Sequence, residues 1–174
     1  MDQIIVEPLS RTAISLLFPL VKLVAPSVDL QAWRRFALSA LDRRRGTLAG
    51  VLTARRISRH HFSGMVCYRR ELTLLDGQIM QIRNLMAIDI LDTKPIILAL
   101  MHFLGSLAQS GGCLKLHILV PEDNVSLLIL PGLIGALQQT VKIHHCLDIY
   151  ASTERRTDIE AAMMSSDGLT FRHQ

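Results

Sequence analysis

Cysteine is scarce in this sequence, and its spacing excludes the scaffolds that depend on it. The 174 residues contain three cysteines, Cys67, Cys113 and Cys146, which lie far apart and form no CxxC pair. An odd number of separated cysteines argues against a disulfide framework and against a zinc knuckle. Cysteine usage of this kind fits a reducing compartment, so we expect a cytoplasmic protein.

Long apolar runs are also missing. The best candidate for a membrane span, residues 13–26, is interrupted by Pro19 and Lys22, and it is shorter than the roughly 20 apolar residues that a span needs. A secretory signal begins with basic residues, whereas the acidic Asp2 and Glu7 stand near this N-terminus. The sequence therefore predicts no membrane partner. We expect residues 13–26 to form an amphipathic core helix that Pro19 breaks or kinks.

Aromatic residues make up only 5 % of the chain, while 49 % of residues are hydrophobic and 20 % are charged, which is globular composition. The net charge of +4 hides an asymmetry, because residues 1–87 have a balance of +7 and residues 88–174 a balance of −3. A basic half could meet an anionic cofactor, an acidic substrate or nucleic acid. The scarcity of aromatics and the lack of a nucleic-acid motif argue against nucleic acid.

Hydrophobic periodicity predicts an alternation of strands and helices. Ser10 and Asp29 are predicted N-caps, Gly46 a helix end, and Asp76-Gly77 the turn of a hairpin. Strands are predicted at residues 4–9, 47–57, 65–75, 78–90, 113–120 and 141–152, and helices at residues 10–24, 29–45, 94–110, 121–139 and 153–166.

This order predicts an α/β (α+β) fold with a mixed, mostly antiparallel central sheet flanked by helices. The three strands within residues 47–90 should form an antiparallel meander. A crossover through the helix at 94–110 should place strand 114–120 beside strand 79–90. We expect residues 1–151 to form one domain, with a helix and tail at residues 152–174 packed on it or trailing from it.

The order of elements resembles the GNAT N-acyltransferase fold over roughly residues 4–150. The features that carry the likeness are the helix pair before the meander, the Asp76-Gly77 hairpin, the "LMAIDI" strand that leads into a helix, and "LHILVPEDN" with Asn124 before the next helix. The resemblance implies transfer of an acyl group from acetyl-CoA or another acyl-CoA to an amine. It also implies that the main chain at about Ala87, Ile88 and Ile90 binds the pantetheine arm, with Asn124 nearby.

The pyrophosphate loop of that family has the pattern Q/R-x-x-G-x-G/A, and here it is degenerate. Pro95 falls about where the middle glycine belongs, and Ile97 about where the last Gly or Ala belongs. Proline has no N–H group to offer a phosphate. The groups left to face the pyrophosphate are the Thr93 hydroxyl, the Lys94 ammonium and the N–H groups of Ile96 and Ile97.

The resemblance supplies no catalytic residue. The position of the family's tyrosine general acid, seven residues after Asn124, is Pro131. The strand that often carries a glutamate base has Gln81, Arg83 and Asn84 instead. These losses suggest a divergent or inactive member, and the catalytic residues stay unknown at this point.

Histidine pairs offer a different chemistry. His60-His61 and His144-His145, the latter followed by Cys146, could in principle converge on a metal. Neighbouring side chains on a strand point to opposite faces, so each pair could supply only one ligand easily. His60 or His61 could alternatively act as a base, since both fall in a polar turn.

Three further reactive residues have simple structural interpretations. Cys67 lies in the middle of a predicted strand without a neighbouring base, which favours a buried structural thiol. Asp89 and Asp92 flank a predicted helix start, so we expect a structural hydrogen-bonding group and a helix N-cap rather than a catalytic pair.

Two functions are therefore left open. One is an N-acyltransferase that acts on a small-molecule or protein amine. The other is a catalytically inactive domain of the same fold that binds acyl-CoA or a partner through its basic half. A homodimer is compatible with both, and the sequence does not identify the acyl group or the acceptor.

Overall fold

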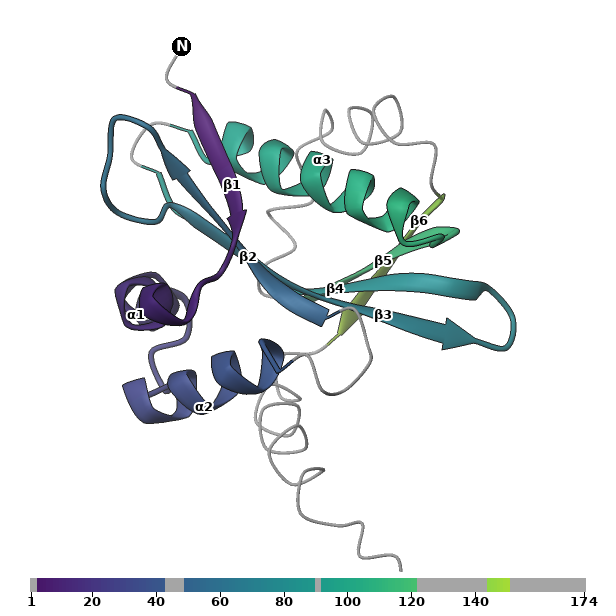
Figure 1. The fold of residues 1–174 in the computed structure, drawn as a ribbon, viewed down its shortest axis with the longest axis horizontal. Coiled ribbons are helices and arrows are strands. Elements are labelled where there is room, and N and C mark those ends of the chain that lie inside the picture. The colour runs from purple at the N-terminus through teal and green to yellow at the C-terminus, as the bar shows by residue number, and fades with distance from the viewer. Residues whose placement is uncertain (1–2, 43–48, 90–91, 122–143, 151–174) are drawn as a thin grey trace, which may run out of the picture.

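The computed structural model describes residues 3–42, 49–89, 92–121 and 144–150. A six-stranded sheet forms its centre, with strand order β1-β2-β3-β4-β5-β6 (Figure 1). The strands are β1 (Ile4–Pro8), β2 (Ala49–Arg56), β3 (Gly64–Thr73), β4 (Gly77–Ala87), β5 (Lys115–Pro121) and β6 (His144–Tyr150). The helices are a 3₁₀ turn η1 (Arg11–Ala13), α1 (Ile14–Val24), α2 (Leu30–Ala40) and α3 (Lys94–Ser110).

The sheet is mixed and mostly antiparallel, as predicted. Strands β1 to β4 pair antiparallel in chain order, whereas β4 with β5 and β5 with β6 pair in parallel. The β3–β4 hairpin turns at Asp76-Gly77, where Gly77 has a φ of 66° that favours glycine. The crossover through α3 places β5 beside β4, which confirms the predicted neighbours.

Helix α3 covers one face of the sheet and packs the larger core (Figure 1). Its apolar stripe is fully buried because residues three and four apart lie on one side of a helix. On the sheet, this core takes every second residue of β2 to β5. Its members on the helix are Ile96, Ile97, Leu100, Met101, Leu104 and Ala108, and on the strands Leu52, Ala54, Val66, Met80, Ile82, Leu116 and Ile118.

Helices α1 and α2 cover the opposite face over β2 and β3 (Figure 1). The Trp33 indole N–H donates to the Ile14 carbonyl at 2.7 Å and joins the two helices inside this second core. Asp29 caps α2, since its carboxylate accepts the Ala32 N–H at 2.7 Å. The predicted amphipathic core helix and the predicted Asp29 cap are both confirmed.

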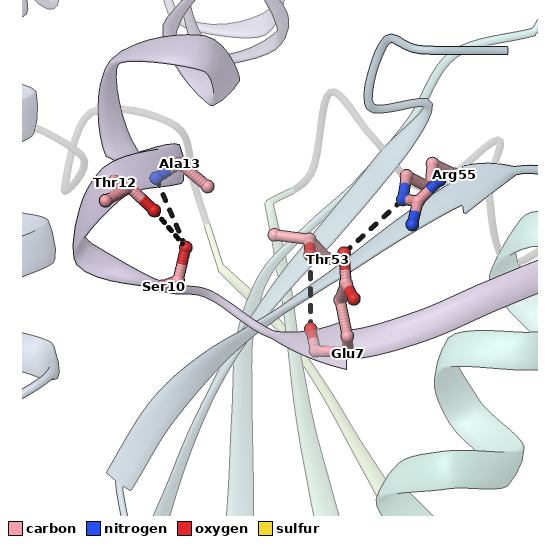
Figure 2. A network of polar contacts seen from close by, with 6 residues as sticks. All are labelled: Glu7, Ser10, Thr12, Ala13, Thr53 and Arg55. Atoms are coloured by element: carbon pink, nitrogen blue, oxygen red, sulfur yellow. Dashed lines mark hydrogen bonds and ion pairs between the residues drawn. The ribbon is translucent and has the colours of Figure 1, made fainter.

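Polar contacts fasten β1 and the turn that follows it (Figure 2). The Thr53 hydroxyl donates to the Glu7 carbonyl at 3.1 Å, and the Arg55 Nε–H donates to the Glu7 carboxylate at 3.4 Å. Ser10 accepts the Ala13 N–H at 3.3 Å. Ser10 is therefore the N-cap that the sequence predicted, although the first turn it caps is the 3₁₀ turn η1.

Of the two effects predicted for Pro19, a break or a kink, the break is wrong, because α1 runs from Ile14 to Val24 through it. Proline removes one hydrogen bond, to the Ser15 carbonyl. Burial of Ile14, Leu17 and Leu20 holds the helix together, since tertiary packing supplies most helical stability.

Helix α2 is shorter than predicted and ends at Ala40. The backbone tightens there into an i→i−3 bond, from the Asp42 N–H to the Ser39 carbonyl. Gly46 and the helices predicted at 121–139 and 153–166 lie outside the described residues. None of the described helices is long and apolar enough to cross a bilayer.

Candidate functional site

Strands β4 and β5 separate part of the way along their length. Their pairing begins at Ile79 with Lys115 and ends at Ile82 with Ile118. Beyond this point β4 continues to Ala87 along β3, and β5 continues to Pro121 along β6. We call residues 83–87 of β4 and 119–121 of β5 the β4–β5 fork. Its two facing main-chain edges have no strand partner among the described residues.

A β-bulge lies at the start of the fork. The β3–β4 register passes from the pair Cys67–Arg83 to the pair Met65–Met86, so β4 has one residue more than β3 there. Asn84 takes up the extra length with a φ of 51°, a left-handed conformation that asparagine tolerates better than most residues. A bulge bends its strand and sharpens its twist. The bulge therefore explains why β4 leaves β5 after Ile82.

The predicted contacts to the pantetheine arm fall at the far end of the fork. Ala87 is the last residue of β4 and pairs with Gly64. The Ile88 N–H donates to the Ser63 carbonyl at 2.8 Å. The remaining predicted residues, Ile90 and Asn124, lie outside the described part of the chain.

The first turn of α3 contains the residues that were predicted to face a pyrophosphate. The Lys94 N–H donates to the Asp92 carboxylate at 2.9 Å. The N–H groups of Ile96 and Ile97 both donate to the Thr93 carbonyl at 3.1 Å. The αR conformation of Thr93 turns its carbonyl toward both donors, and the bond from Ile97 is the ordinary i→i−4 bond of an α-helix. The contact of these amides with a pyrophosphate stays a prediction.

Asp89 is a structural residue, as predicted. Its carboxylate is completely buried and lies 2.6 Å from the Arg56 Nη2 and 3.6 Å from the Arg59 Nη1. Together with the Ser63–Ile88 bond, this ion pair fixes the β2–β3 loop to the end of β4. The prediction that Asp92 is the N-cap of α3 is off by one residue, because Thr93 is the N-cap. Asp92 is exposed, and its carboxylate accepts the Lys94 N–H from the position before the cap.

A set of polar side chains lies beside the fork, on the face of the sheet opposite α3. Arg83 pairs in register with Cys67, which belongs to the core under α1 and α2, so Arg83 and Gln81 share that face. The Arg83 Nε–H donates to the Gln81 Oε1 at 2.9 Å. On β5, His117 is the register partner of Gln81. We call Gln81, Arg83 and His117 the polar triplet.

His117 was not among the residues predicted from the sequence, because a lone histidine in an apolar strand is a weaker signal than the pairs His60-His61 and His144-His145. The signal was present, since His117 alternates with Leu116 and Ile118 in a buried strand and so had to emerge on the second face. By contrast, His60 and His61 lie in an exposed turn of the β2–β3 loop. No metal-binding group of three or more ligating residues is found in the described ranges.

Cys67 and Cys113 are buried free thiols. Burial raises the pKa of the Cys67 thiol to about 12, against a smaller lowering by its hydrogen bond with the Asn84 amide. Burial also raises the pKa of Cys113, and the Arg70 charge opposes that shift. A thiol that stays protonated is a poor nucleophile, so Cys67 is the structural residue that the sequence predicted.

Several N-acetyltransferases of solved structure share this architecture. A ribosomal-protein-alanine N-acetyltransferase from Brucella melitensis biovar Abortus 2308 has a TM-score of 0.62 and 19 % identity, over 76 % of this chain and 90 % of that chain. An aminoglycoside N-acetyltransferase in complex with CoA has a TM-score of 0.63 and 11 % identity, over 76 % and 88 % of the two chains. Glucosamine-6-phosphate N-acetyltransferase from Arabidopsis thaliana has a TM-score of 0.55 and 13 % identity, over 99 % of each chain. No protein-family model and no curated protein matches the sequence.

Proposed function

Since the chain has the fold of the GNAT N-acetyltransferases, we propose that it transfers an acyl group from a pantetheine thioester to an amine. Acetyl-CoA and other acyl-CoAs are the simplest donors of this class. The acceptor is a small molecule or a protein with a primary amine, as in the N-acetyltransferases whose structures resemble this one.

The observation that carries the proposal is the β4–β5 fork. Pairing stops at Ile82 and Ile118 although both strands continue. Exposed strand edges bind extended ligands through main-chain hydrogen bonds, in the manner of an added strand. A pantetheine arm is an extended chain with two amide groups, so it can bond with such edges without a particular side chain.

The reaction needs few protein groups. The amine nitrogen attacks the thioester carbonyl, a C–N bond forms, the C–S bond breaks, and the thiolate leaves. The proton lost by the amine passes to a base and finally to the departing sulfur. Most of the rate then comes from holding the amine and the thioester side by side in a ternary complex.

The polar triplet supplies the base that the sequence did not reveal. His117 lies on the strand that forms one side of the fork, two residues before the strands separate at Leu119. A positioned imidazole is a common general base and acid, so the proposed role of His117 is to take a proton from the ammonium acceptor and return it to the leaving thiolate. Gln81 and Arg83 border the same surface and provide donors that orient an acceptor.

Thermal unfolding with acetyl-CoA and longer acyl-CoAs tests the binding step. A ligand at about 100 times its dissociation constant adds roughly 2.7 kcal/mol to the free energy of unfolding. Release of free thiol in the presence of a panel of small amines and N-terminal peptides tests the transfer step. Stabilisation together with amine-dependent thiol release supports the proposal, and the absence of both contradicts it.

A second candidate function is a non-catalytic interaction module. The observation in its favour is the tip of the β3–β4 hairpin, where Leu72, Leu74 and Leu75 have exposed fractions of 82 %, 101 % and 93 %. Clustered exposed leucines are typical of interaction surfaces. Stabilisation by a thioester without thiol release would favour a binder that does no chemistry. No stabilisation by any thioester would favour the interaction module.

A further inference from the structure

Arg83 is the first residue of β4 after its pairing with β5 ends, so it stands where the β4–β5 fork opens. We propose that the amine acceptor carries an anionic group, a carboxylate or a phosphate, and that the Arg83 guanidinium binds this group. The inference rests on the proposed function, because it names the acceptor class of that reaction. It makes Arg83 a specificity-determining residue beside the proposed base, His117.

The face on which Arg83 lies follows from the register of the sheet. Arg83 pairs with Cys67, whose side chain belongs to the core under α1 and α2, and Gln81 pairs with His117. Residues directly opposite each other on neighbouring strands have their side chains on the same face. The three members of the polar triplet therefore share the face opposite α3, and of these three only Arg83 belongs to the fork itself.

A hydrogen bond fixes the direction of the guanidinium. The Arg83 Nε–H donates to the Gln81 Oε1 at 2.9 Å, and both residues are half-buried. The other N–H donors of an arginine are on its two terminal nitrogens, in a planar arrangement that matches the oxygens of a carboxylate or a phosphate. A guanidinium that is already oriented loses less side-chain freedom when it binds such a group.

The charges on this face favour an anion beside the fork. Among the described residues of β3, β4 and β5 that lie on it, the basic ones are Arg69, Arg83 and Lys115, and the acidic one is Glu71. Glu71 lies 3.5 Å from the Arg69 Nε, and Asp76 of the hairpin turn pairs with Lys115. These two carboxylates therefore lie toward the hairpin tip, whereas Arg83 lies toward the fork. An anionic group at the fork would meet the positive end of this charge distribution.

The first test compares acceptors in the amine-dependent thiol-release assay with acetyl-CoA and the full chain. β-Alanine is compared with its amide, and phosphoethanolamine with ethanolamine, with kcat/KM expressed per unprotonated amine. We expect the anionic amine to be preferred by about tenfold or more in at least one pair, and that pair distinguishes carboxylate from phosphate. Equal values within both pairs, or transfer to neutral amines alone, overturn the inference and leave the proposed function intact. No transfer to any amine rejects the proposed function and the inference with it.

Substitutions assign the preference to Arg83. Arg83→Gln should lower the preference for the anionic amine by about tenfold or more, and Arg83→Lys, which keeps the charge but not the planar donors, should lower it less. Arg69→Gln is the matched control, because it removes the same charge from the same face at an exposed position. It should change the preference by less than about threefold.

Thermal unfolding shows whether each variant is folded. A preference that survives in folded Arg83→Gln overturns the inference, as does an equal loss of preference in Arg69→Gln. If Arg83→Gln does not fold, Arg83→Lys decides, and an unchanged preference in that variant overturns the inference.

Discussion

The β4–β5 fork and the first turn of α3 both lie near the end of β4, yet their main-chain groups are used in opposite ways. In the fork, two strands continue past their last shared pair at Ile82 and Ile118, and their facing edges have no strand partner within the part of the chain that the structure describes. In α3, the N–H groups of Lys94, Ile96 and Ile97 are all bonded within the protein. The comparison teaches that a strand edge and a helix start next to each other in one fold can differ in how far their main-chain groups are satisfied.

The junction between the two regions depends on a buried ion pair, and breaking it should have the largest effect. Asp89→Asn is expected to lower the free energy of unfolding by about 3 kcal/mol, because Arg56 would lose its buried counter-charge. Urea denaturation measures this change. The matched control is Glu7→Gln, which breaks the exposed pair with Arg55 and should cost less than about 1 kcal/mol. Equal losses in the two variants would contradict the structural role of Asp89.

Under the proposed function, His117 beside the fork is the general base. His117→Gln is therefore expected to lower kcat by about 100-fold, the usual contribution of a general base, and to leave KM for the donor nearly unchanged. Steady-state thiol release measures both constants. His102→Gln, on the exposed surface of α3, is the matched control and should behave like the wild type. A similar small effect of both substitutions would remove His117 from the mechanism.

The fork depends on the bulge at Asn84. Asn84→Val is expected to destabilise the protein by about 2 kcal/mol, because a β-branched residue resists a φ of 51°. If the strand straightens to relieve that strain, β4 moves toward β5 and KM for the donor should rise. Asn84→Gly is the control, since glycine adopts the same backbone freely. A donor KM that is the same in both variants would show that the bulge does not set the fork.

Cys67, which lies on β3 beside the bulge at Asn84, should make the free energy of unfolding depend on pH. The raised pKa of Cys67, about 12, means that its thiol stays neutral in the folded protein while the unfolded thiol ionises above about pH 9. The stability that comes from keeping this thiol neutral is therefore fully present below pH 9. It is lost from the free energy of unfolding as the pH rises toward 12. The expected loss is about 1 kcal/mol at pH 10.

The difference between wild type and Cys67→Ala across pH 8 to 11 isolates this loss from other groups that titrate there. The free energies of unfolding of the two proteins should differ by a constant amount below pH 9, and the difference should shrink above it. Parallel curves throughout would show that Cys67 is not buried as the structure has it.

The smallest effect is expected far from both regions, at the hairpin tip. Leu74→Asp should change the free energy of unfolding by no more than about 0.5 kcal/mol, because the side chain is fully exposed. Thermal unfolding measures this, and the acyltransferase assay should be unaffected. A large loss of stability would reveal a contact at the tip.

Much of the fold could be predicted from the sequence because its signals are local. The meander, the Asp76-Gly77 turn and the helix that begins at Lys94 follow from periodicity and turn chemistry. The passage of α1 through Pro19 could not be predicted in this way, since long-range burial of Leu17 and Leu20 outweighs one missing hydrogen bond.

The candidate site was less predictable. The degenerate loop pattern pointed to a weak phosphate site. It did not show that the Asp92 carboxylate would accept the Lys94 N–H. Nor did it show that the Thr93 carbonyl would accept the N–H groups of both Ile96 and Ile97. His117 was missed for a related reason. The sequence shows His117 as a single histidine in an apolar strand. Only the parallel register shows that it lies beside Gln81.

By itself, the sequence determined the order of the elements, the mixed sheet, and the absence of glycines and of a Pro95 N–H at the start of α3. Those properties depend on residue type and on neighbours along the chain. Only the tertiary structure decided where β4 leaves β5, which main-chain groups find partners, and which polar side chains share a face. Each of these depends on pairing between residues distant in sequence, and hydrogen-bond satisfaction is a property of the folded whole.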